Sequence, residues 1–185
     1  MKSFSKLQKK LEGELLDSVF DRGRYATDAS IYQIMPKAIV LPKSVSDIKA
    51  SITFARENGL KVLPRGAGTS QNGQTVNDAI VLDNSKYLKR LLSLDLERNR
   101  CVVEPGLVLD ELNNKLKPYG LWFPVDVSTS SQATLGGMVG NNSAGGSSIR
   151  YGIMRDNVHS IKALLADGRQ ATFGPLKEKF FGIND

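Results

Sequence analysis

Cysteine, histidine and long apolar runs are scarce in this chain of 185 residues. Its single cysteine, Cys101, excludes a disulfide within the chain, and the apolar neighbours of this residue indicate a buried thiol. The single histidine, His159, follows Val158 at the expected start of a strand, and one histidine does not make a metal site. We therefore expect a structural histidine and no metal. No apolar run is long enough to span a bilayer or to form a signal peptide, so we expect a cytoplasmic protein, either free or at the cytoplasmic face of a membrane.

The positive charge is not concentrated in one segment. A formal net charge of +6 could indicate a nucleic-acid partner, but lysine and arginine are spread along the chain and no basic-aromatic motif occurs. A basic surface that attracts an anionic cofactor explains the charge as well. A basic nucleic-acid-binding domain stays open as a hypothesis that predicts salt-sensitive binding. Only the net charge favours it, and we expect no nucleic-acid partner.

Glycine, in contrast, is frequent and gathers in two segments. The first, Pro64–Gln74 (PRGAGTSQNGQ), follows an apolar stretch, Leu60–Leu63, that predicts a strand. Glycine permits positive φ and close backbone approach, so this loop can direct several N–H groups at phosphate oxygens. A tight polar surface turn is the alternative. The loop matches neither a Walker loop, which needs a lysine where Gln74 stands, nor a Rossmann fingerprint, which needs a glycine in place of Gln71.

The second glycine-rich segment covers residues 122–152. A flexible linker is the alternative here, but a linker would not contain side chains such as Trp122 and Met138. Thr134 can cap a short helix whose first amides, those of Gly136 and Gly137 among them, give a second set of donors. Two amide-rich segments suit a long ligand, with phosphates held at one and a planar group along the other.

The rest of the chain predicts two lobes. An amphipathic helix reaches about Asp17, and a loop follows at residues 24–30. The strand Lys37–Leu41, a helix capped by Ser44 and ended by Gly59, and the strand Leu60–Leu63 then form a parallel unit.

The antiparallel part comes later in the sequence. A strand at residues 79–82 precedes a hairpin of residues 91–96 and 101–103, and a short helix follows at residues 109–116. We predict an α+β fold in which a small parallel α/β lobe precedes a lobe with antiparallel strands.

Several motifs together resemble one family. They are TDAS, PxAIVLPxSVSDI, LPRGAGTSQNGQ, VEPGLVLDELN, GLWFPVD, ATLGGMVGNNSAGG, RYG and LLADG, in that order. This set is similar to the FAD-binding domain of vanillyl-alcohol-oxidase/p-cresol-methylhydroxylase (PCMH) flavoproteins. It resembles most closely the branch of FAD-linked D-lactate, glycolate and D-2-hydroxyglutarate dehydrogenases. The resemblance runs from about Tyr25 to Gly168.

The resemblance implies an FAD cofactor between the two lobes. Residues 65–70 would hold its pyrophosphate, residues 124–145 the flavin and ribityl chain, and residues 158–161 the adenine. Relatives with covalent flavin carry a histidine where Thr69 stands, so non-covalent FAD is expected. The implied cofactor-binding residues are Arg65, Gly66, Ala67, Gly68, Thr69, Ser70, Pro124, Asp126, Thr134, Gly136, Gly137, Asn141, Asn142, Gly145, Val158 and Ile161.

The resemblance also implies a domain division and a reaction. Residues 1–30 would be an N-terminal helix and loop, and residues 31–185 an FAD-binding domain that is incomplete at its C-terminal end and lacks the substrate-binding cap. The full enzyme would oxidise a D-2-hydroxy acid, similar to lactate or glycolate, by hydride transfer to flavin N5. Its electron acceptor, an iron–sulfur domain, a quinone or a carrier, would lie outside this chain, to which we assign no catalytic residue and no activity of its own. The alternative is a flavin reductase of the UDP-N-acetylenolpyruvoylglucosamine reductase type, in which NADPH reduces the flavin.

Overall fold

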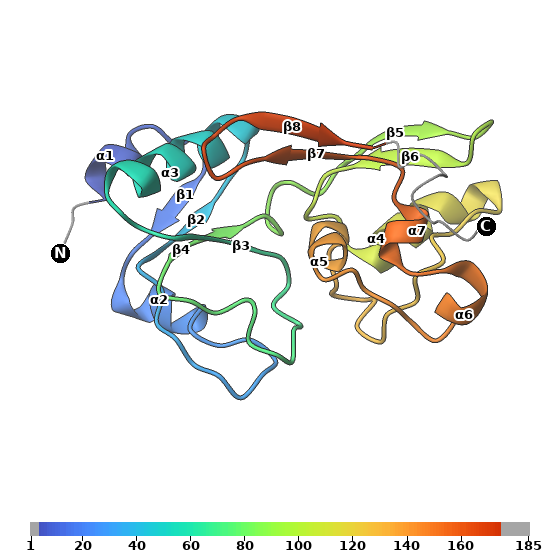
Figure 1. Ribbon diagram of the computed structural model, residues 1–185, viewed down its shortest axis with the longest axis horizontal. Coiled ribbons are helices and arrows are strands. Elements are labelled where there is room, and N and C mark those ends of the chain that lie inside the picture. Colours follow the sequence, from blue (N-terminus) through green and yellow to red (C-terminus); the bar gives the residue numbers. More distant parts are fainter. Residues whose placement is uncertain (1–3, 175–185) are drawn as a thin grey trace, which may run out of the picture.

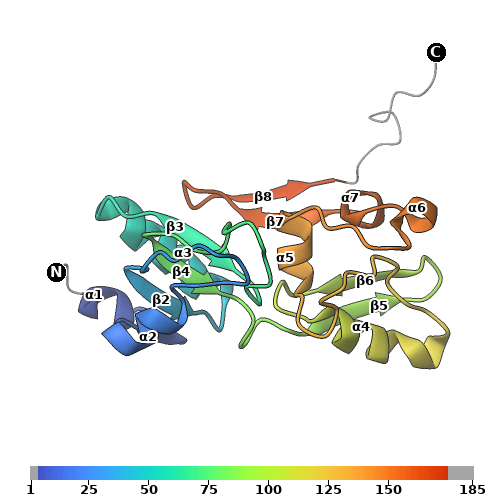
Figure 2. The ribbon, with the colours of Figure 1, turned by 90° about the horizontal axis from the view of Figure 1, so that it is seen from below.

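The computed structural model describes residues 4–174, which form two lobes that lie side by side (Figure 1). Figure 2 shows the same two lobes from below, with the last hairpin running along both. Helices and strands are, in chain order, α1 (Ser5–Gln8), β1 (Glu14–Leu16), α2 (Val19–Arg24), β2 (Ala38–Leu41), α3 (Val45–Glu57), β3 (Val62–Arg65), β4 (Ile80–Asp83), β5 (Leu91–Asp95), β6 (Arg100–Val103), α4 (Leu109–Leu116), the 3-10 helix η1 (Lys117–Tyr119), α5 (Leu135–Gly140), α6 (Ser148–Tyr151), α7 (Met154–Asn157), β7 (Ile161–Leu164) and β8 (Gln170–Phe173). Among these residues no helix combines the length and apolar character that crossing a membrane requires.

The first lobe is built on a sheet with the strand order β1-β2-β4-β3. Both β2 and β3 run parallel to β4, which lies between them, so the predicted parallel arrangement is confirmed. Every residue of β2 and β4 is buried, as expected for parallel strands that are covered on both faces. The carboxyl ends of β3 and β4 therefore lie together at one edge, and the first glycine-rich loop begins there.

Helix α3 starts and ends where the sequence predicts. The Ser44 hydroxyl accepts a hydrogen bond from the Asp47 amide at 3.3 Å, and Gly59 has a φ of 61° just after the helix. Asp47 itself is buried, and its carboxylate accepts hydrogen bonds from the amides of Glu12, Gly13 and Lys43. The start of α3 thus fixes the N-terminal segment against the sheet. The strand expected at Leu60–Leu63 lies two residues later, as β3.

The prediction of one helix as far as Asp17 is wrong. Helix α1 ends at Gln8, and β1 pairs antiparallel with β2. Gly13 lies so close to β2 that a Cβ there would be 2.1 Å from the Leu41 carbonyl oxygen. Leu7 of α1 and Leu15 of β1 pack in the same core. The leucine spacing is helical, but pairing with β2 outweighs it and makes the segment around Leu15 a strand. The six-residue helix α2, which ends at Arg24, was also not predicted.

The second lobe contains the predicted hairpin and short helices. Strands β5 and β6 pair antiparallel, and α4 follows, as the leucine spacing indicates. The buried residues of its core are Leu107, Leu109, Leu112, Leu116, Val125, Ala133, Leu135, Met138 and Met154. Cys101 packs against this core and is half-buried, less than the sequence predicts, and this burial raises the pKa of its thiol. The predicted α+β fold, with a parallel lobe before an antiparallel one, is confirmed.

The hairpin β7–β8 joins the two lobes. In Figures 1 and 2 it extends from the region of α3 in the first lobe to α7 in the second. At the turn of the hairpin, the Arg56 guanidinium at the end of α3 donates to the Asp167 carbonyl at 2.9 Å. At its other end, Ile161 and Phe173 line a cavity together with residues of α5 and α7. The hairpin therefore contacts both lobes and supports their relative position.

Candidate functional site

The two glycine-rich segments lie against each other in the structure. A Cβ at Gly66 would be only 2.1 Å from the Thr134 hydroxyl oxygen. Farther along the loop, the Gln74 side-chain amide donates to Asn141 Oδ1 at 2.8 Å, and the Ser70 hydroxyl donates to Gln74 Oε1. Segments about 70 residues apart in sequence therefore form one surface, and the absence of a side chain at Gly66 is what permits the contact.

The first loop has a run of backbone amides without hydrogen-bond partners. Among residues 4–174, the backbone N–H groups of residues 67–71 donate no hydrogen bond. Gly68 and Gly73 both have a φ of 73°, a conformation that favours glycine. Successive amides in such a turn can converge on one anion, and the hydroxyls of Thr69 and Ser70 lie beside them in the chain. This loop has the properties of a phosphate-binding site.

The arginine of this loop supports the loop rather than a ligand. The Arg65 guanidinium donates to the carbonyls of Tyr25, Thr27 and Thr75 at 2.9–3.3 Å and lies 5.3 Å from the centre of the Tyr25 ring. Burial lowers the pKa of this guanidinium, and the neighbouring carboxylates Asp83 and Asp28 oppose that shift. The side chain is therefore committed to holding the surrounding chain, and the donors that remain in this loop are backbone amides and hydroxyls.

Two carboxylates that the sequence analysis did not single out complete this support. Asp83 accepts hydrogen bonds from the Tyr25 hydroxyl at 2.7 Å and from Ser85, and burial together with this contact raises the pKa of Tyr25. The pKa of Asp28 is lowered overall. Burial by itself would raise this pKa, but the hydrogen bonds that the carboxylate accepts from Ser30 and Thr75 outweigh burial. Asp28 lies in the TDAS motif, which is the sequence signal that could have identified it as a supporting residue.

In the second segment, Thr134 caps helix α5 as predicted. The Thr134 hydroxyl, which is buried, accepts a hydrogen bond from the Gly137 amide at 3.3 Å at the start of α5. The expectation that the Gly136 and Gly137 amides remain available as donors is wrong, because the Gly136 amide donates to the Pro105 carbonyl at 2.8 Å. A Cβ at Gly136 would be 2.5 Å from the Pro105 Cβ. These glycines therefore allow backbone segments to pack closely.

Asp126 fixes the next part of the same segment. Its carboxylate accepts hydrogen bonds from the Ser147 amide at 2.9 Å and the Ser147 hydroxyl at 2.8 Å, and these contacts lower the pKa of Asp126. Gly145 packs so closely that a Cβ there would be 2.4 Å from the Asp126 carbonyl oxygen. The structure thus brings the predicted residues Asp126 and Gly145 together, and the Asp126 side chain links two loops.

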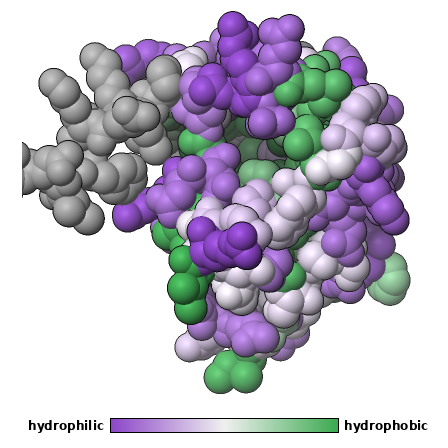
Figure 3. All heavy atoms as spheres, turned by 90° about the vertical axis from the view of Figure 1, so that its right-hand side faces the viewer, coloured by the Kyte–Doolittle hydropathy of each residue, from purple (hydrophilic) through white to green (hydrophobic). Residues whose placement is uncertain are grey.

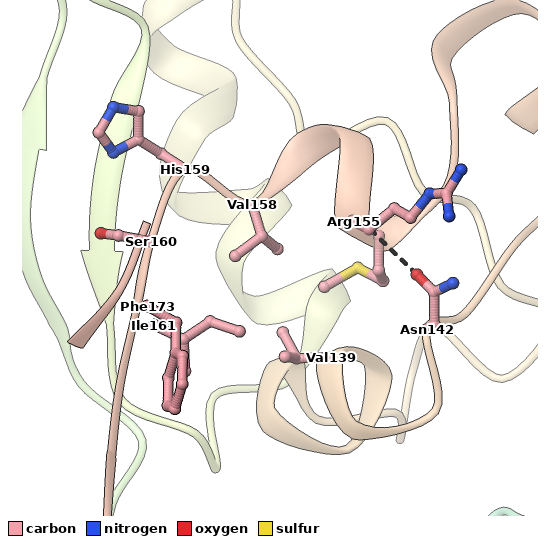
Figure 4. A pocket seen from close by; sticks show the side chains of 9 residues that line it. Val139, Asn142, Arg155, Val158, His159, Ser160, Ile161 and Phe173 are labelled. Carbon is pink, nitrogen blue, oxygen red and sulfur yellow. Dashed lines mark hydrogen bonds between the residues drawn. The ribbon is translucent and has the colours of Figure 1, made fainter. Parts of the chain in front are cut away.

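A mostly apolar cavity of about 220 Å³ lies at the far end of α5, between α5, α7 and the hairpin β7–β8. Figure 4 shows Val139, Val158 and Ile161 directed toward it. The ring of His159 points away, and this residue is exposed rather than part of the core. The full lining is Val139, Asn142, Met154, Arg155, Val158, His159, Ser160, Ile161 and Phe173. Two of these, Val158 and Ile161, are the residues that the resemblance assigns to the adenine.

Helix α5 connects the cavity to the contact between the glycine-rich segments. Thr134 precedes the helix and touches Gly66, whereas Val139 and Asn142, near its other end, line the cavity. A helix of six residues is about 9 Å long, so an extended ligand can reach both places. The face in Figure 3 is hollowed in its upper part, with hydrophobic residues deep in the hollow and mostly hydrophilic residues around it.

Contacting glycine-rich segments next to an apolar cavity form a surface that can hold an elongated ligand. Residues 36–174 match the model of the FAD binding domain family. The chain therefore belongs to this family of FAD-binding domains, of the vanillyl-alcohol-oxidase/PCMH type that the sequence motifs resemble.

The sequence relatives are hydroxy-acid dehydrogenases and oxidases. The chain is 38% identical over 164 residues to D-2-hydroxyglutarate dehydrogenase of Escherichia coli, a match that covers 87% of this chain and 16% of that protein. It is 32% identical over 155 residues to the glycolate oxidase subunit GlcD of Bacillus subtilis, which covers 82% of this chain and 33% of that protein. A third relative is the mitochondrial D-lactate dehydrogenase [cytochrome] of Arabidopsis thaliana, 35% identical over 72% of this chain and 24% of that protein. The chain thus spans about a sixth to a third of the length of these relatives.

Solved structures show the same fold at low sequence identity. Alkyldihydroxyacetonephosphate synthase aligns with a TM-score of 0.83 and 19% identity over 95% of this chain and 36% of that protein. 6-Hydroxy-D-nicotine oxidase of Arthrobacter nicotinovorans aligns with a TM-score of 0.76 and 23% identity over 91% of this chain and 37% of that protein. These likenesses establish the architecture of the chain.

Proposed function

We propose that this chain is the FAD-binding portion of a flavoenzyme that oxidises a D-2-hydroxy acid similar to lactate or glycolate. The observation that carries the proposal is the contact of the two glycine-rich segments at Gly66 and Thr134, beside residues 67–71, whose amides donate no hydrogen bond within the described part of the chain. Three relatives, a D-2-hydroxyglutarate dehydrogenase, a glycolate oxidase subunit and a D-lactate dehydrogenase, support this substrate class.

The residues present fit an FAD molecule. FAD carries two phosphates, for which the amides of residues 67–70 and the hydroxyls of Thr69 and Ser70 provide donors. The cavity at Val158 and Ile161 suits the adenine because its lining is mostly apolar. In between, the flavin and ribityl chain would lie along the wall formed by residues 124–126 and 134–145. A threonine at position 69 supports non-covalent binding.

The chain contributes binding and orientation to the reaction. When bound, FAD supplies a hydride acceptor at N5. We assign the base that takes the hydroxyl proton of the substrate to a part of the enzyme outside this chain, and no residue here is proposed as catalytic. The electron acceptor, an iron–sulfur domain, a quinone or a carrier, is likewise left open.

The domain division and the location are also proposals. Residues 31–185 would form the FAD-binding domain and residues 1–30 a preceding segment, although β1 of that segment pairs with β2 across the division. A cytoplasmic location, free or at the membrane face, is proposed from the sequence. Fractionation of cells that produce the native protein would test it.

The cofactor assignment can be tested with ligands of decreasing length. We expect the apo-protein to bind FAD more tightly than FMN, which lacks the adenine and one phosphate, and FMN more tightly than riboflavin. Titration followed by flavin fluorescence measures all three. Equal affinity for FAD and FMN would contradict the placement of the adenine.

A substitution in the cavity refines this test. Val158→Phe should weaken FAD binding but leave FMN binding unchanged, because the added ring fills the space assigned to the adenine. Val19→Phe, at an exposed position of α2, is the matched control and should change neither affinity.

The reaction itself must be measured on the longer enzyme. With an artificial electron acceptor and no oxygen, we expect oxidation of D-2-hydroxyglutarate, D-lactate or glycolate, and no oxidation of the L-enantiomers of the chiral acids. The present chain should turn over none of them. Reduction of the flavin by NADPH would instead favour the reductase alternative.

A further inference from the structure

The segment of residues 27–30 (TDAS) lies along the loop assigned to the phosphates. The Ala29 amide donates a hydrogen bond to the Gly68 carbonyl at 3.1 Å, in the middle of that loop. At the start of the loop, the Arg65 guanidinium donates to the Thr27 carbonyl at 2.9 Å. The TDAS segment therefore contacts the loop along one side and is joined to it through backbone atoms.

Asp28 fastens the same segment to the end of the loop. Its carboxylate accepts a hydrogen bond from the Thr75 hydroxyl at 2.8 Å and another from the Ser30 amide at 2.8 Å. The second bond closes a tight turn around Ala29, because an aspartate side chain that pairs with the amide two residues on fixes the backbone between them. The Ala29 amide is thus held in place opposite Gly68.

The hydrogen bond to Gly68 sets the direction of the next amide. In a trans peptide the carbonyl of one residue and the N–H of the following residue point in opposite directions. Because the Gly68 carbonyl is directed at the Ala29 amide, the Thr69 N–H is directed away from the TDAS segment. Within residues 4–174 this N–H donates no hydrogen bond. It therefore faces the side of the loop that the TDAS segment leaves uncovered.

Without this hydrogen bond the peptide between Gly68 and Thr69 could turn over. Gly68 has a φ of 73° and no side chain, so its ψ can change widely at little cost. A peptide that turned over would present the Gly68 carbonyl where the Thr69 N–H now lies. A carbonyl oxygen repels a phosphate oxygen, whereas an N–H binds it. The Ala29 amide therefore excludes the peptide orientation that cannot bind an anion.

We propose that Ala29 is a positioning residue, whose backbone amide locks the peptide between Gly68 and Thr69 so that the Thr69 N–H is presented to a phosphate of FAD. Asp28 assists by fixing the turn that holds the Ala29 amide. This inference rests on the proposed function, because that function supplies the phosphates. The lock acts on the phosphate contact, so it affects flavins that carry phosphate and not riboflavin, which carries none.

A backbone ester tests the lock directly. Replacement of Ala29 by L-lactic acid, introduced by semisynthesis, removes one N–H and keeps the methyl group. We expect the Kd for FAD to rise about tenfold, or about 1.4 kcal/mol, while the Kd for riboflavin stays within about twofold of the wild-type value. Equal losses for both flavins would indicate a general loosening of the site, and unchanged affinities an amide without effect; either result overturns the proposal.

Ala79 provides the matched control for the ester. Its amide donates to the Asn77 carbonyl at 3.0 Å, just before β4 and therefore at the opposite edge of the sheet from the loop. The same replacement at Ala79 should leave both Kd values unchanged. A loss there that is specific to FAD would overturn the proposal, because it would show that any deleted backbone hydrogen bond of this lobe has the same effect.

Asp28→Ala is a second variant that needs no semisynthesis. Loss of a carboxylate beside an anion site would by charge alone tighten phosphate binding, whereas loss of the turn weakens it. We expect the Kd for FAD to rise about three- to tenfold with no change for riboflavin, and tighter FAD binding would overturn the proposal. Asp167→Ala is its control, because the Asp167 carboxylate accepts the Arg169 amide two residues on at 2.9 Å, in the turn of β7–β8. It should change neither affinity, and a loss specific to FAD there would also overturn the proposal.

Inorganic pyrophosphate separates failure of this inference from failure of the proposed function. Titrated into the isotope-labelled wild-type chain, it should shift the NMR resonance of the Thr69 amide, and the ester at Ala29 should require about tenfold more pyrophosphate for the same shift. Absence of a shift at Thr69 would overturn the inference. Binding of pyrophosphate at Thr69 without binding of FAD would instead contradict the proposed function and support the lock.

Discussion

Gly66 offers the sharpest test of how the two lobes meet. In Gly66→Ala the new Cβ would be 2.1 Å from the Thr134 hydroxyl oxygen, about 1 Å short of a tolerable contact. The φ of Gly66 lies outside the left-handed region, so backbone strain does not contribute. Either the segments separate or Thr134 rotates and gives up its bond to the Gly137 amide.

The magnitude follows from these two costs. Overpacking costs about 1–3 kcal/mol, and loss of the helix cap costs about 1 kcal/mol. We expect Gly66→Ala to lower the free energy of unfolding by about 2–4 kcal/mol and the Tm by roughly 5–15 °C. FAD binding should weaken in parallel, because the loop that starts at Gly66 is displaced. Urea denaturation and FAD titration measure the two effects.

A double-mutant cycle isolates the contact. Thr134→Ala removes the hydroxyl, so Gly66→Ala should cost little in that background, and the coupling free energy should be about 1–3 kcal/mol. Gly23→Ala in α2 is the control, since a Cβ there meets no atom within 4 Å. It should leave stability unchanged or raise it by up to about 1 kcal/mol. Wild-type stability of Gly66→Ala, or additive effects of the two substitutions, would refute the reasoning.

Three further predictions concern side chains around the site. Arg65→Lys should lower the free energy of unfolding by about 2–3 kcal/mol in urea, because an ammonium group cannot reach the carbonyls that the guanidinium connects; an unchanged midpoint would contradict this. Gln74→Ala should weaken FAD binding about two- to tenfold by fluorescence titration, through loss of its bond to Asn141, and Gln74→Glu should not restore it because the donor is still missing. Ser147 lowers the pKa of Asp126, so this carboxylate stabilises the fold above its unfolded pKa of about 3.9, and the contribution is lost as pH falls through the lower folded value. The difference in stability between wild type and Asp126→Asn, measured by acid unfolding, should therefore shrink below about pH 4; a constant difference would refute it.

Local signals in the sequence predicted much of the architecture. Ser44 and Thr134 cap helices as expected, since a cap depends on residues only three positions apart. Continuous apolar runs correctly indicated β2 and β4. The prediction of one N-terminal helix failed because Leu15 packs from a strand that pairs with β2, and nothing in the local sequence distinguishes that strand from a continued helix.

The sequence located the candidate site but did not show which of its hydrogen-bond donors are already paired. The glycine pattern identified both segments, and the sequence resemblance identified their cofactor. The sequence could not reveal that the Arg65 guanidinium donates to backbone carbonyls, or that the Gly136 amide already donates to the Pro105 carbonyl.

The sequence by itself thus determined where backbone can approach closely, because that property belongs to glycine. The tertiary structure alone decided which atoms meet there: Thr134 against Gly66, Pro105 against Gly136 and Asp126 against Gly145. Such contacts join residues distant in sequence: the packing of the two lobes sets the first, and packing within the second lobe sets the other two.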